Sequence, residues 1–235
     1  MKSLNDQPSS LQNVMGITSR KEREKEQRRK SILKAATEVF FEKGFQQASM
    51  DMIAERSQLA KGTLYLYFKS KEDLYLALME DGLDILHNMF DEAIEAGESI
   101  EEKVRNVTKA YYGFTQTHHD YYQVMMMMDS GLLSDKVDQN QLQHIRLLQM
   151  SGVEKLQKVV EEGISQGHYE PSTDAKILVL MAWAATWGAI MLSTEKRKIL
   201  PMFSDIDTEQ FVLEISDRMT RSFQVKKSDK NDAST

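Results

Sequence analysis

Residues 44–74, GFQQASMDMIAERSQLAKGTLYLYFKSKEDL, decide the fold. Within this stretch, Ser49 can cap a short helix that ends near Ser57, and a second short helix is expected over residues 61–68. Apolar side chains from both helices supply the small core that would fix the angle between them: Ile53, Leu64 and Phe68. Two short helices with a brief turn between them have the size of a helix-turn-helix.

The second short helix carries groups suited to a DNA groove on its outer face and at its start: Lys61, Gly62, Thr63, Tyr65 and Tyr67. They would offer a cation, a hydroxyl, two phenols and free backbone N–H groups. Helix N-termini attract phosphate because their first N–H groups lack partners within the helix. The arrangement predicts a helix that meets DNA.

The flanking segments continue the helical pattern. Residues 23–43 place apolar side chains on one face, and Gly44 then supplies a left-handed stop that lets Phe45 fold back on Phe40. The run from Ser70 to Asp73 matches a capping box and opens a long helix. The later helices are expected over residues 71–96, 99–118, 120–129, 134–166 (with room for a break near Gly152), 174–198 and 208–225.

Only 3 prolines and 11 glycines punctuate the 235 residues, and no stretch alternates cleanly enough to be a strand. An all-α fold is therefore expected, with an N-terminal three-helix helix-turn-helix domain and a C-terminal helical ligand-binding and dimerisation domain. The expected boundaries are a disordered tail at 1–19, the DNA-binding domain at 20–70, the helical domain at 71–225 and a second disordered tail at 226–235.

Charge is distributed unevenly along the chain. Residues 18–71 hold 13 Lys and Arg against 7 Asp and Glu, which gives +6, whereas the whole chain has a net charge of −6. The remainder therefore carries −12. A basic N-terminal segment with an acidic remainder is expected where one small domain contacts phosphates.

The stretch 44–74 closely resembles the DNA-binding domain of the TetR-like family, the tetracycline-repressor type of bacterial transcription regulator, and KGTLYLYFKSKEDL (61–74) is its most specific part. The resemblance implies that five residues lie at or in the major groove: Lys61, Gly62, Thr63, Leu66 and Tyr67. It implies that Tyr65 and Lys71 clamp phosphates and that Ser49 and Met50 approach the DNA backbone. It also implies a bacterial cytoplasmic protein that joins the nucleoid when bound to DNA.

Two positions depart from the family pattern. Gln58 stands at the turn where family members usually have glycine, and a left-handed Gln58 would cost about 1–2 kcal/mol unless the turn differs. Ala60 stands where serine is usual and cannot cap the second helix. Further upstream, Arg28 and Arg29 could extend the footprint along phosphates, or they could simply belong to a solvated helix end.

The C-terminal body should form the dimer. The run Ile177–Leu192 is apolar all round, has no charge and is shorter than the roughly 18–20 residues of a membrane span. A helix buried in protein is therefore expected, with membrane insertion as a minor alternative. Together with the last helix it could form a four-helix bundle across a two-fold axis, where the resembling family dimerises, or it could only complete a monomer core.

Large or aromatic side chains in the body suit a small apolar or amphipathic effector: Phe90, Tyr111, Phe114, Met125, Met128, Trp183 and Trp187. Most residues of this kind are simply core. No nucleophile set, phosphate-binding glycine loop or metal-ligand spacing stands out, so no enzyme, metal or cofactor is expected. The predicted function is a homodimeric regulator, a repressor that an effector releases from a near-palindromic operator. The alternative is a DNA-bound interaction or architectural protein without an effector.

Overall fold

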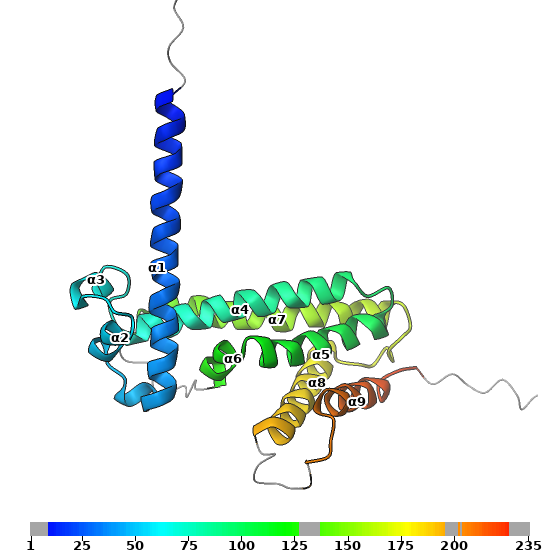
Figure 1. Ribbon diagram of the computed structural model, residues 1–235. Coiled ribbons are helices and arrows are strands. Elements are labelled where there is room, and N and C mark those ends of the chain that lie inside the picture. The colour runs from blue at the N-terminus through cyan, green and yellow to red at the C-terminus, as the bar shows by residue number, and fades with distance from the viewer. Residues whose placement is uncertain (1–8, 127–136, 196–201, 203, 226–235) are drawn as a thin grey trace, which may run out of the picture. The chain divides into compact units, whose positions relative to one another are not determined.

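The computed structural model describes residues 9–126, 137–195, 202 and 204–225. Their regular elements are helices, and an isolated bridge joins Tyr169 to Gln224. The helices are α1 (Ser9–Gln47), α2 (Met50–Arg56), α3 (Lys61–Tyr65), α4 (Lys71–Glu95), α5 (Ile100–Thr117), α6 (His119–Met126), α7 (Gln139–Ser165), α8 (Ala175–Ile190), the π-helical turn η1 (Met191–Glu195) and α9 (Thr208–Arg221). The predicted all-α fold with an N-terminal helix-turn-helix is confirmed (Figure 1).

These residues group into two compact units. The first contains the described residues up to Leu78 together with Val137, and the second contains Met79–Met126 and the described residues from Asp138 onward. Helix α4 therefore contributes its first turns to one unit and the rest of its length to the other.

The first unit is built around the apolar face predicted for α1. Ile32, Val39 and Phe40 are fully or almost fully buried. Gly44 has a positive φ of 75°, and the Phe45 ring beyond it lies 5.3 Å from the Phe40 ring, as the sequence predicted. This kink closes the core beneath α2 and α3.

Helix α1 begins at Ser9, where a disordered tail was predicted up to residue 19 and a helix start near Arg23. The polar composition of residues 9–22 suggested a tail. However, the nearest helix-breaking residue upstream is Pro8, and elongating an existing helix adds a hydrogen bond per residue without a new nucleation cost. The tail predicted at 226–235 lies outside the described residues.

Serine caps set the predicted helix starts. Met52 N donates to Ser49 Oγ, Asp73 N donates to Ser70 Oγ at 3.1 Å, and Glu102 N donates to Ser99 Oγ at 3.2 Å. The Asp73 carboxylate accepts in return from Lys69 N at 3.0 Å, which completes a capping-box arrangement at the start of α4.

Gln58, in the turn between α2 and α3, has a φ of 57° and is the only non-glycine with positive φ among the described residues. Its left-handed backbone is the one that the sequence suggested. The strain arises because the Cβ atom crowds the following carbonyl oxygen.

The Gln58→Gly variant should therefore raise the free energy of local opening of this turn by about 1 kcal/mol, since glycine removes the steric cost but adds flexibility to the unfolded chain. Amide hydrogen exchange of Leu59, which donates to Ala54 O at 2.9 Å, measures this opening. The matched control is Gln58→Ala, which keeps the Cβ atom and should gain nothing. Equal protection in both variants would contradict the strain.

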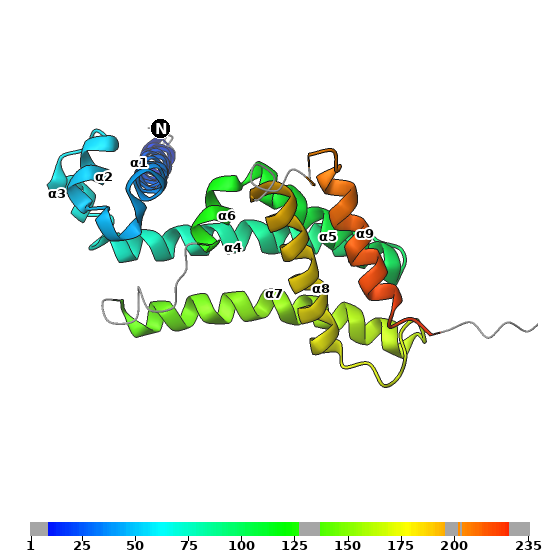
Figure 2. The ribbon, with the colours of Figure 1, turned by 90° about the horizontal axis from the view of Figure 1, so that it is seen from below.

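In the second unit, α8 packs against α7 and lies beside α9, which in turn packs on α5 (Figure 2). Helix α7 continues through Gly152, where a break was allowed for. A Cβ atom there would lie 2.9 Å from His87 Nε2, so this glycine serves the packing of α7 on α4. Helix α8 ends at Ile190 and passes into η1, earlier than the predicted end near residue 198.

Helix α8 and its extension, Ala175–Ser193, form one segment of 19 residues that by length and composition alone could cross a membrane. Only 28% of it is buried inside this chain. The buried part faces α7 and α9, while Ile177, Met181 and Trp187 remain exposed. The exposed apolar face is thus unpaired within a single copy of the chain.

Candidate nucleic-acid interface and interior cavity

The angle between α2 and α3 is fixed by the small core that the sequence predicted. Ile53 and Leu64 are fully buried, and Phe68 closes the core behind the last turn. Helix α3 proper ends at Tyr65, and the predicted helix to Phe68 continues as turns in which Phe68 N donates to Leu64 O at 3.1 Å. Ala60 caps α3 without a side-chain hydrogen bond, as predicted.

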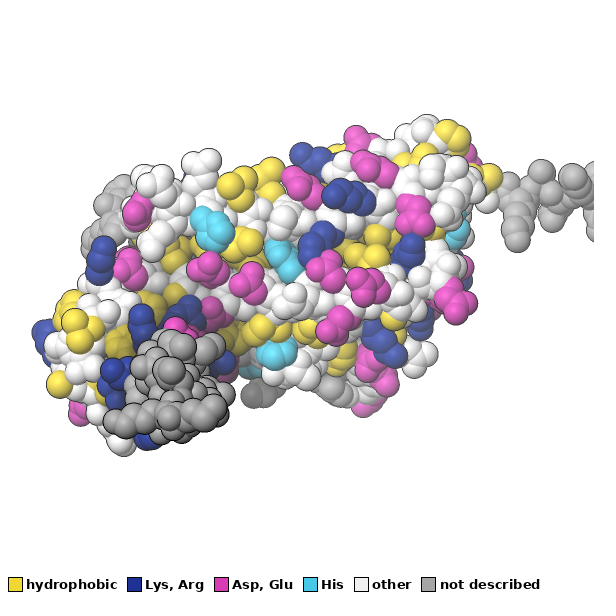
Figure 3. Space-filling view, turned by 90° about the horizontal axis from the view of Figure 1, so that it is seen from above, with side chains coloured by type: hydrophobic (Ala, Val, Ile, Leu, Met, Phe, Trp, Pro, Cys, Tyr) yellow, Lys and Arg dark blue, Asp and Glu magenta, His cyan; other side chains and the backbone are white. Residues whose placement is uncertain are grey.

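The outer surface of this unit is formed by α3 and the turn after it. Leu66 is 84% exposed, an unusual position for a leucine that no contact within the unit requires. Tyr65, Lys61 and Gly62 are exposed, while Thr63 and Tyr67 are half-buried. In the space-filling view, Lys and Arg side chains gather over the first unit, and acidic side chains are spread over the second (Figure 3). Four of the predicted DNA-contact residues are thus open to a partner, and the other two are partly so.

Contacts among the described residues do not require a glycine at position 62 of α3. Its φ is not in the left-handed region, and a Cβ atom would have nothing within 4 Å. Glycine in a helix costs about 1 kcal/mol relative to alanine. A glycine retained at this cost, with open space around it, fits a position that another molecule approaches closely.

We therefore expect Gly62→Ala to leave the fold as stable as before or slightly more stable, and to weaken DNA binding about tenfold, because the added methyl group would hold the phosphate backbone away from the N–H groups of α3. Fluorescence anisotropy with a bound DNA duplex measures the affinity, and circular dichroism melting controls for the fold. Unchanged affinity would mean that DNA does not approach this turn.

Lys61 at the start of α3 pairs with Asp51 of α2, with 2.5 Å between Nζ and the carboxylate. The hydrogen bond that Lys61 donates to Asp51, together with the negative charge of that carboxylate, raises the pKa of Lys61 above its ordinary value. Both side chains are mostly exposed. The carboxylate fixes the direction of the lysine and must compete with phosphate for it.

Lys71 is placed differently from the phosphate clamp that the resemblance implied. Its Nζ donates to the carbonyl oxygens of Phe45 at 2.8 Å, Gln46 at 3.0 Å and Ala48 at 3.0 Å. It also lies 4.8 Å from the centre of the Phe45 ring. An ammonium has three N–H donors, and all three are used to cap the carbonyl end of α1. The role that these contacts assign to Lys71 is structural.

The remaining residues predicted to contact DNA lie at the start of α2 and on α1. Met50 is only 9% exposed and faces the core, so its side chain does not reach the surface as expected for a residue that approaches DNA. Ser49 uses its hydroxyl as the α2 cap. On α1, Arg28 is exposed, whereas Arg29 is half-buried and lies 4.0 Å from Glu26.

A cavity of about 80 Å³ lies inside the second unit. Three predicted pocket residues line it: Phe90, Tyr111 and Trp183. Phe114 and Met125 do not line it, although they pack in the same core cluster as Phe90 and Tyr111, and Trp187 is at the surface with Nε1 donating to Met126 Sδ at 3.1 Å. Met128 lies outside the described residues.

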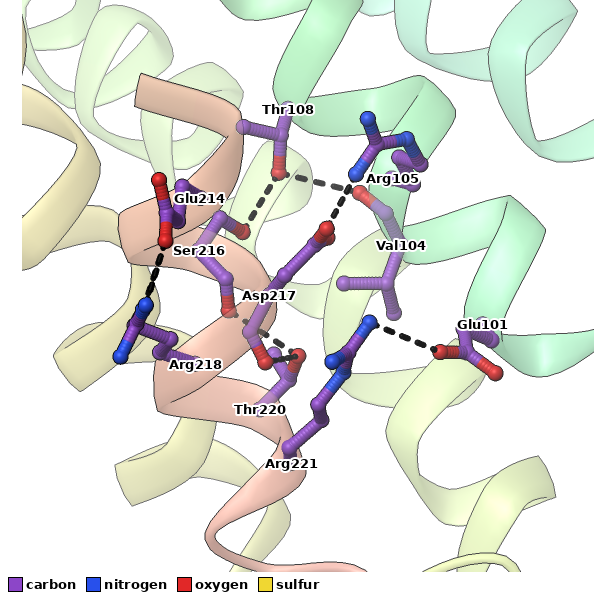
Figure 4. Close-up of polar contacts among 10 residues, drawn as sticks. All are labelled: Glu101, Val104, Arg105, Thr108, Glu214, Ser216, Asp217, Arg218, Thr220 and Arg221. Atoms are coloured by element: carbon purple, nitrogen blue, oxygen red, sulfur yellow. Dashed lines mark hydrogen bonds and ion pairs between the residues drawn. The ribbon is translucent and has the colours of Figure 1, made fainter. Parts of the chain in front are cut away.

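Only large side chains were predicted to line a pocket, but four smaller hydroxyl residues also line the cavity: Thr108, Thr186, Ser216 and Thr220. Thr108 and Ser216 meet between α5 and α9, with 2.8 Å between their hydroxyl oxygens (Figure 4). The available signal was the placement of Ser216 and Thr220 four residues apart along the buried face of α9. Apart from Tyr111 and Trp183, the rest of the lining is apolar.

The model of bacterial regulatory proteins of the tetR family matches residues 32–78 of this chain. The HTH-type transcriptional regulator YhgD of Bacillus subtilis is 28% identical over 144 residues, which cover 61% of this chain and 73% of that protein. The HTH-type transcriptional repressor KstR2 of Mycolicibacterium smegmatis is 26% identical over 172 residues, covering 69% and 78%.

Among solved structures, the transcriptional regulator FadR of Bacillus subtilis in complex with stearoyl-CoA is similar, with a TM-score of 0.61 and 23% identity. The match covers 80% of this chain and 96% of that one, and it shows the same fold. These relatives are bacterial transcription regulators rather than enzymes. The helix-turn-helix domain of this chain, residues 32–78, is that of the bacterial regulatory proteins of the tetR family, and the chain is a DNA-binding transcription regulator.

Proposed function

We propose that the protein is a homodimeric repressor that holds a near-palindromic operator with two copies of α3 and is released from it by a small apolar or amphipathic effector. The observation that carries the proposal is the open outer face of α3. There, Leu66 is almost fully exposed and Gly62 has no neighbour within 4 Å of a Cβ position. Lys61, Thr63, Tyr65 and Tyr67 would supply the polar contacts, and DNA shape would add specificity. Repression is favoured by the likeness to KstR2, which is named a repressor.

The dimer interface of this proposal is the exposed face of α8. Ile177, Met181, Ala184 and Gly188 follow one another at three- and four-residue spacing, and a Cβ atom at Gly188 would have nothing within 4 Å. An apolar helix face with small residues allows the same helix of a second copy to approach closely. Burial in a dimer would explain why this face is apolar without invoking a membrane.

The proposed switch uses the cavity. A volume of about 80 Å³ is smaller than the roughly 300 Å³ at which drug-sized sites begin. An effector must therefore select a conformation in which the helices around the cavity have separated, and a ligand that prefers one conformation shifts the population toward it. Helix α4 lines the cavity through Phe90 and reaches into the DNA-binding unit, so we assign it the coupling role.

The small cavity also favours a second candidate, a DNA-bound interaction protein whose acidic body docks another protein and takes no effector. The two candidates differ in one respect. Only the first requires that a small molecule change the affinity for DNA.

Selection of bound duplexes from a random pool at fixed salt tests the DNA part of the proposal. We expect two half-sites whose centres are about one helical turn apart, related by a dyad. Titration of the selected duplex complex with apolar metabolites then tests release. A selected site without a dyad would contradict the dimeric mode of binding. A DNA complex that no class of effector dissociates would favour the second candidate, a DNA-bound interaction protein without an effector.

A further inference from the structure

We infer that the cavity of the second unit takes the uncharged, hydrocarbon part of its effector and holds a neutral carbonyl oxygen of that effector through the hydroxyl of Thr186. The inference rests on the proposed effector response and names the chemical class of the effector. An acyl thioester and a ketone on a ring system share this chemistry.

The first observation is the unused hydroxyl of Thr186. This side chain is 5% exposed, lines the cavity from α8, and has no hydrogen-bond partner among the residues that the structure describes. A threonine within a helix commonly donates to the carbonyl oxygen four residues before it. Thr37 does so to Leu33 O, and Thr108 does so to Val104 O, each at 3.0 Å. The Thr186 hydroxyl is not among the fully enclosed unpaired polar atoms of the described residues, so it faces accessible space, and a cavity ligand that accepts from it would gain that hydrogen bond.

The other small hydroxyls of the lining are already engaged as donors. Thr108 donates to Val104 O, which leaves Ser216 as the donor in the 2.8 Å contact between Ser216 and Thr108. Thr220 donates to Ser216 O at 3.0 Å (Figure 4). These hydrogen bonds join α5 to α9. Among the serine and threonine residues of the lining, Thr186 on α8 is therefore the one whose hydroxyl can donate to a ligand.

Tyr111 supplies a second donor at the cavity. Burial raises the pKa of this phenol, with a smaller opposing effect from the Trp183 side chain, so Tyr111 keeps its proton at neutral pH. A cavity that presents donors is complementary to an acceptor on the ligand. The acceptor that hydrocarbon effectors most simply carry is a carbonyl oxygen.

The second observation is that no charged side chain lines the cavity among the residues described. The charged groups of α5 and α9 lie outside it and pair with one another: Arg105 with Asp217, Arg218 with Glu214, and Arg221 with Glu101 (Figure 4). A carboxylate inside the cavity would be buried without a counter-charge, which costs far more than burial of a neutral carbonyl group. Any charged part of the effector must therefore stay outside.

Isothermal titration calorimetry of the full chain tests the carbonyl with a matched pair, lauroyl-CoA and its thioether analogue S-dodecyl-CoA, which lacks only the carbonyl oxygen. We expect the thioester to bind roughly three- to tenfold more tightly, the effect of one net hydrogen bond. The Thr186→Val variant, of the same shape, should lose this preference, and Thr186→Ser should keep it. Androstenedione tests a ketone in the same way. The ligand class whose affinity depends on Thr186, acyl thioester or ketone, is the class that the cavity recognises.

A second pair, methyl decanoate and decanoate, tests the charge, and the neutral ester should bind at least tenfold more tightly. The inference is overturned if a probe binds but Thr186→Val retains the preference for the thioester, or if decanoate binds as tightly as its ester. These outcomes would leave the effector response intact. If no probe binds in any arm, the effector response and this inference are both overturned.

Discussion

Met181→Arg should split the protein into monomers and lower its affinity for the operator by at least about a hundredfold. Met181 is 39% exposed in the middle of the apolar face of α8. In a symmetric dimer the new guanidinium would be buried opposite its own copy without a carboxylate partner. Loss of the second half-site removes the intramolecular second contact, which typically contributes a factor of about 10²–10⁴.

Light scattering gives the mass in solution, and fluorescence anisotropy gives the affinity for the operator. The control is Met150→Arg, the same substitution at a methionine of α7 that is 55% exposed. This variant should remain dimeric and bind normally. A Met181→Arg protein that keeps twice the chain mass would place the dimer interface elsewhere.

Lys71→Met should destabilise the DNA-binding unit by roughly 2–3 kcal/mol, because it leaves three carbonyl oxygens at the end of α1 without their charged donor. Methionine keeps an apolar side chain of similar length over the Phe45 ring, so the loss of stability measures the contribution of the ammonium group. Amide hydrogen exchange of α2 and α3 in the intact protein measures the change.

Lys69→Met is the matched control, since Lys69 is exposed and only its backbone N–H is bonded, to Asp73. Its effect on stability should be small. The opposite pattern would restore Lys71 as a phosphate contact: normal protection in Lys71→Met, with the slope of log affinity against log salt reduced by about 0.9.

The helix-turn-helix could be predicted closely because its signals are local. The caps at Ser49 and Ser70, the stop at Gly44 and the strained backbone at Gln58 depend on residues a few positions apart. The role of Lys71 could not, because its partners are carbonyl groups more than twenty residues away and any lysine beside a recognition helix suggests phosphate.

The cavity was predicted only in part for a similar reason. Phe90, Tyr111 and Trp183 reach it, but Phe114, an aromatic side chain on the same helix as Tyr111, is fully buried and does not. Whether an aromatic ring lines a space or fills it depends on how five helices from distant parts of the chain meet. Helix α8 was predicted to be apolar all round, and only the structure separates the face against α7 and α9 from the face left exposed.

Entry of α3 and the turn after it into a DNA groove can be tested directly. The chain has no cysteine, so Leu66→Cys gives a single attachment point on this surface for a DNA-cleaving iron chelate. We expect cleavage of the selected operator at two places related by its dyad, about one helical turn apart, and no cleavage when the chelate is carried by Leu147→Cys on α7. Cleavage from Leu147→Cys without cleavage from Leu66→Cys would contradict it.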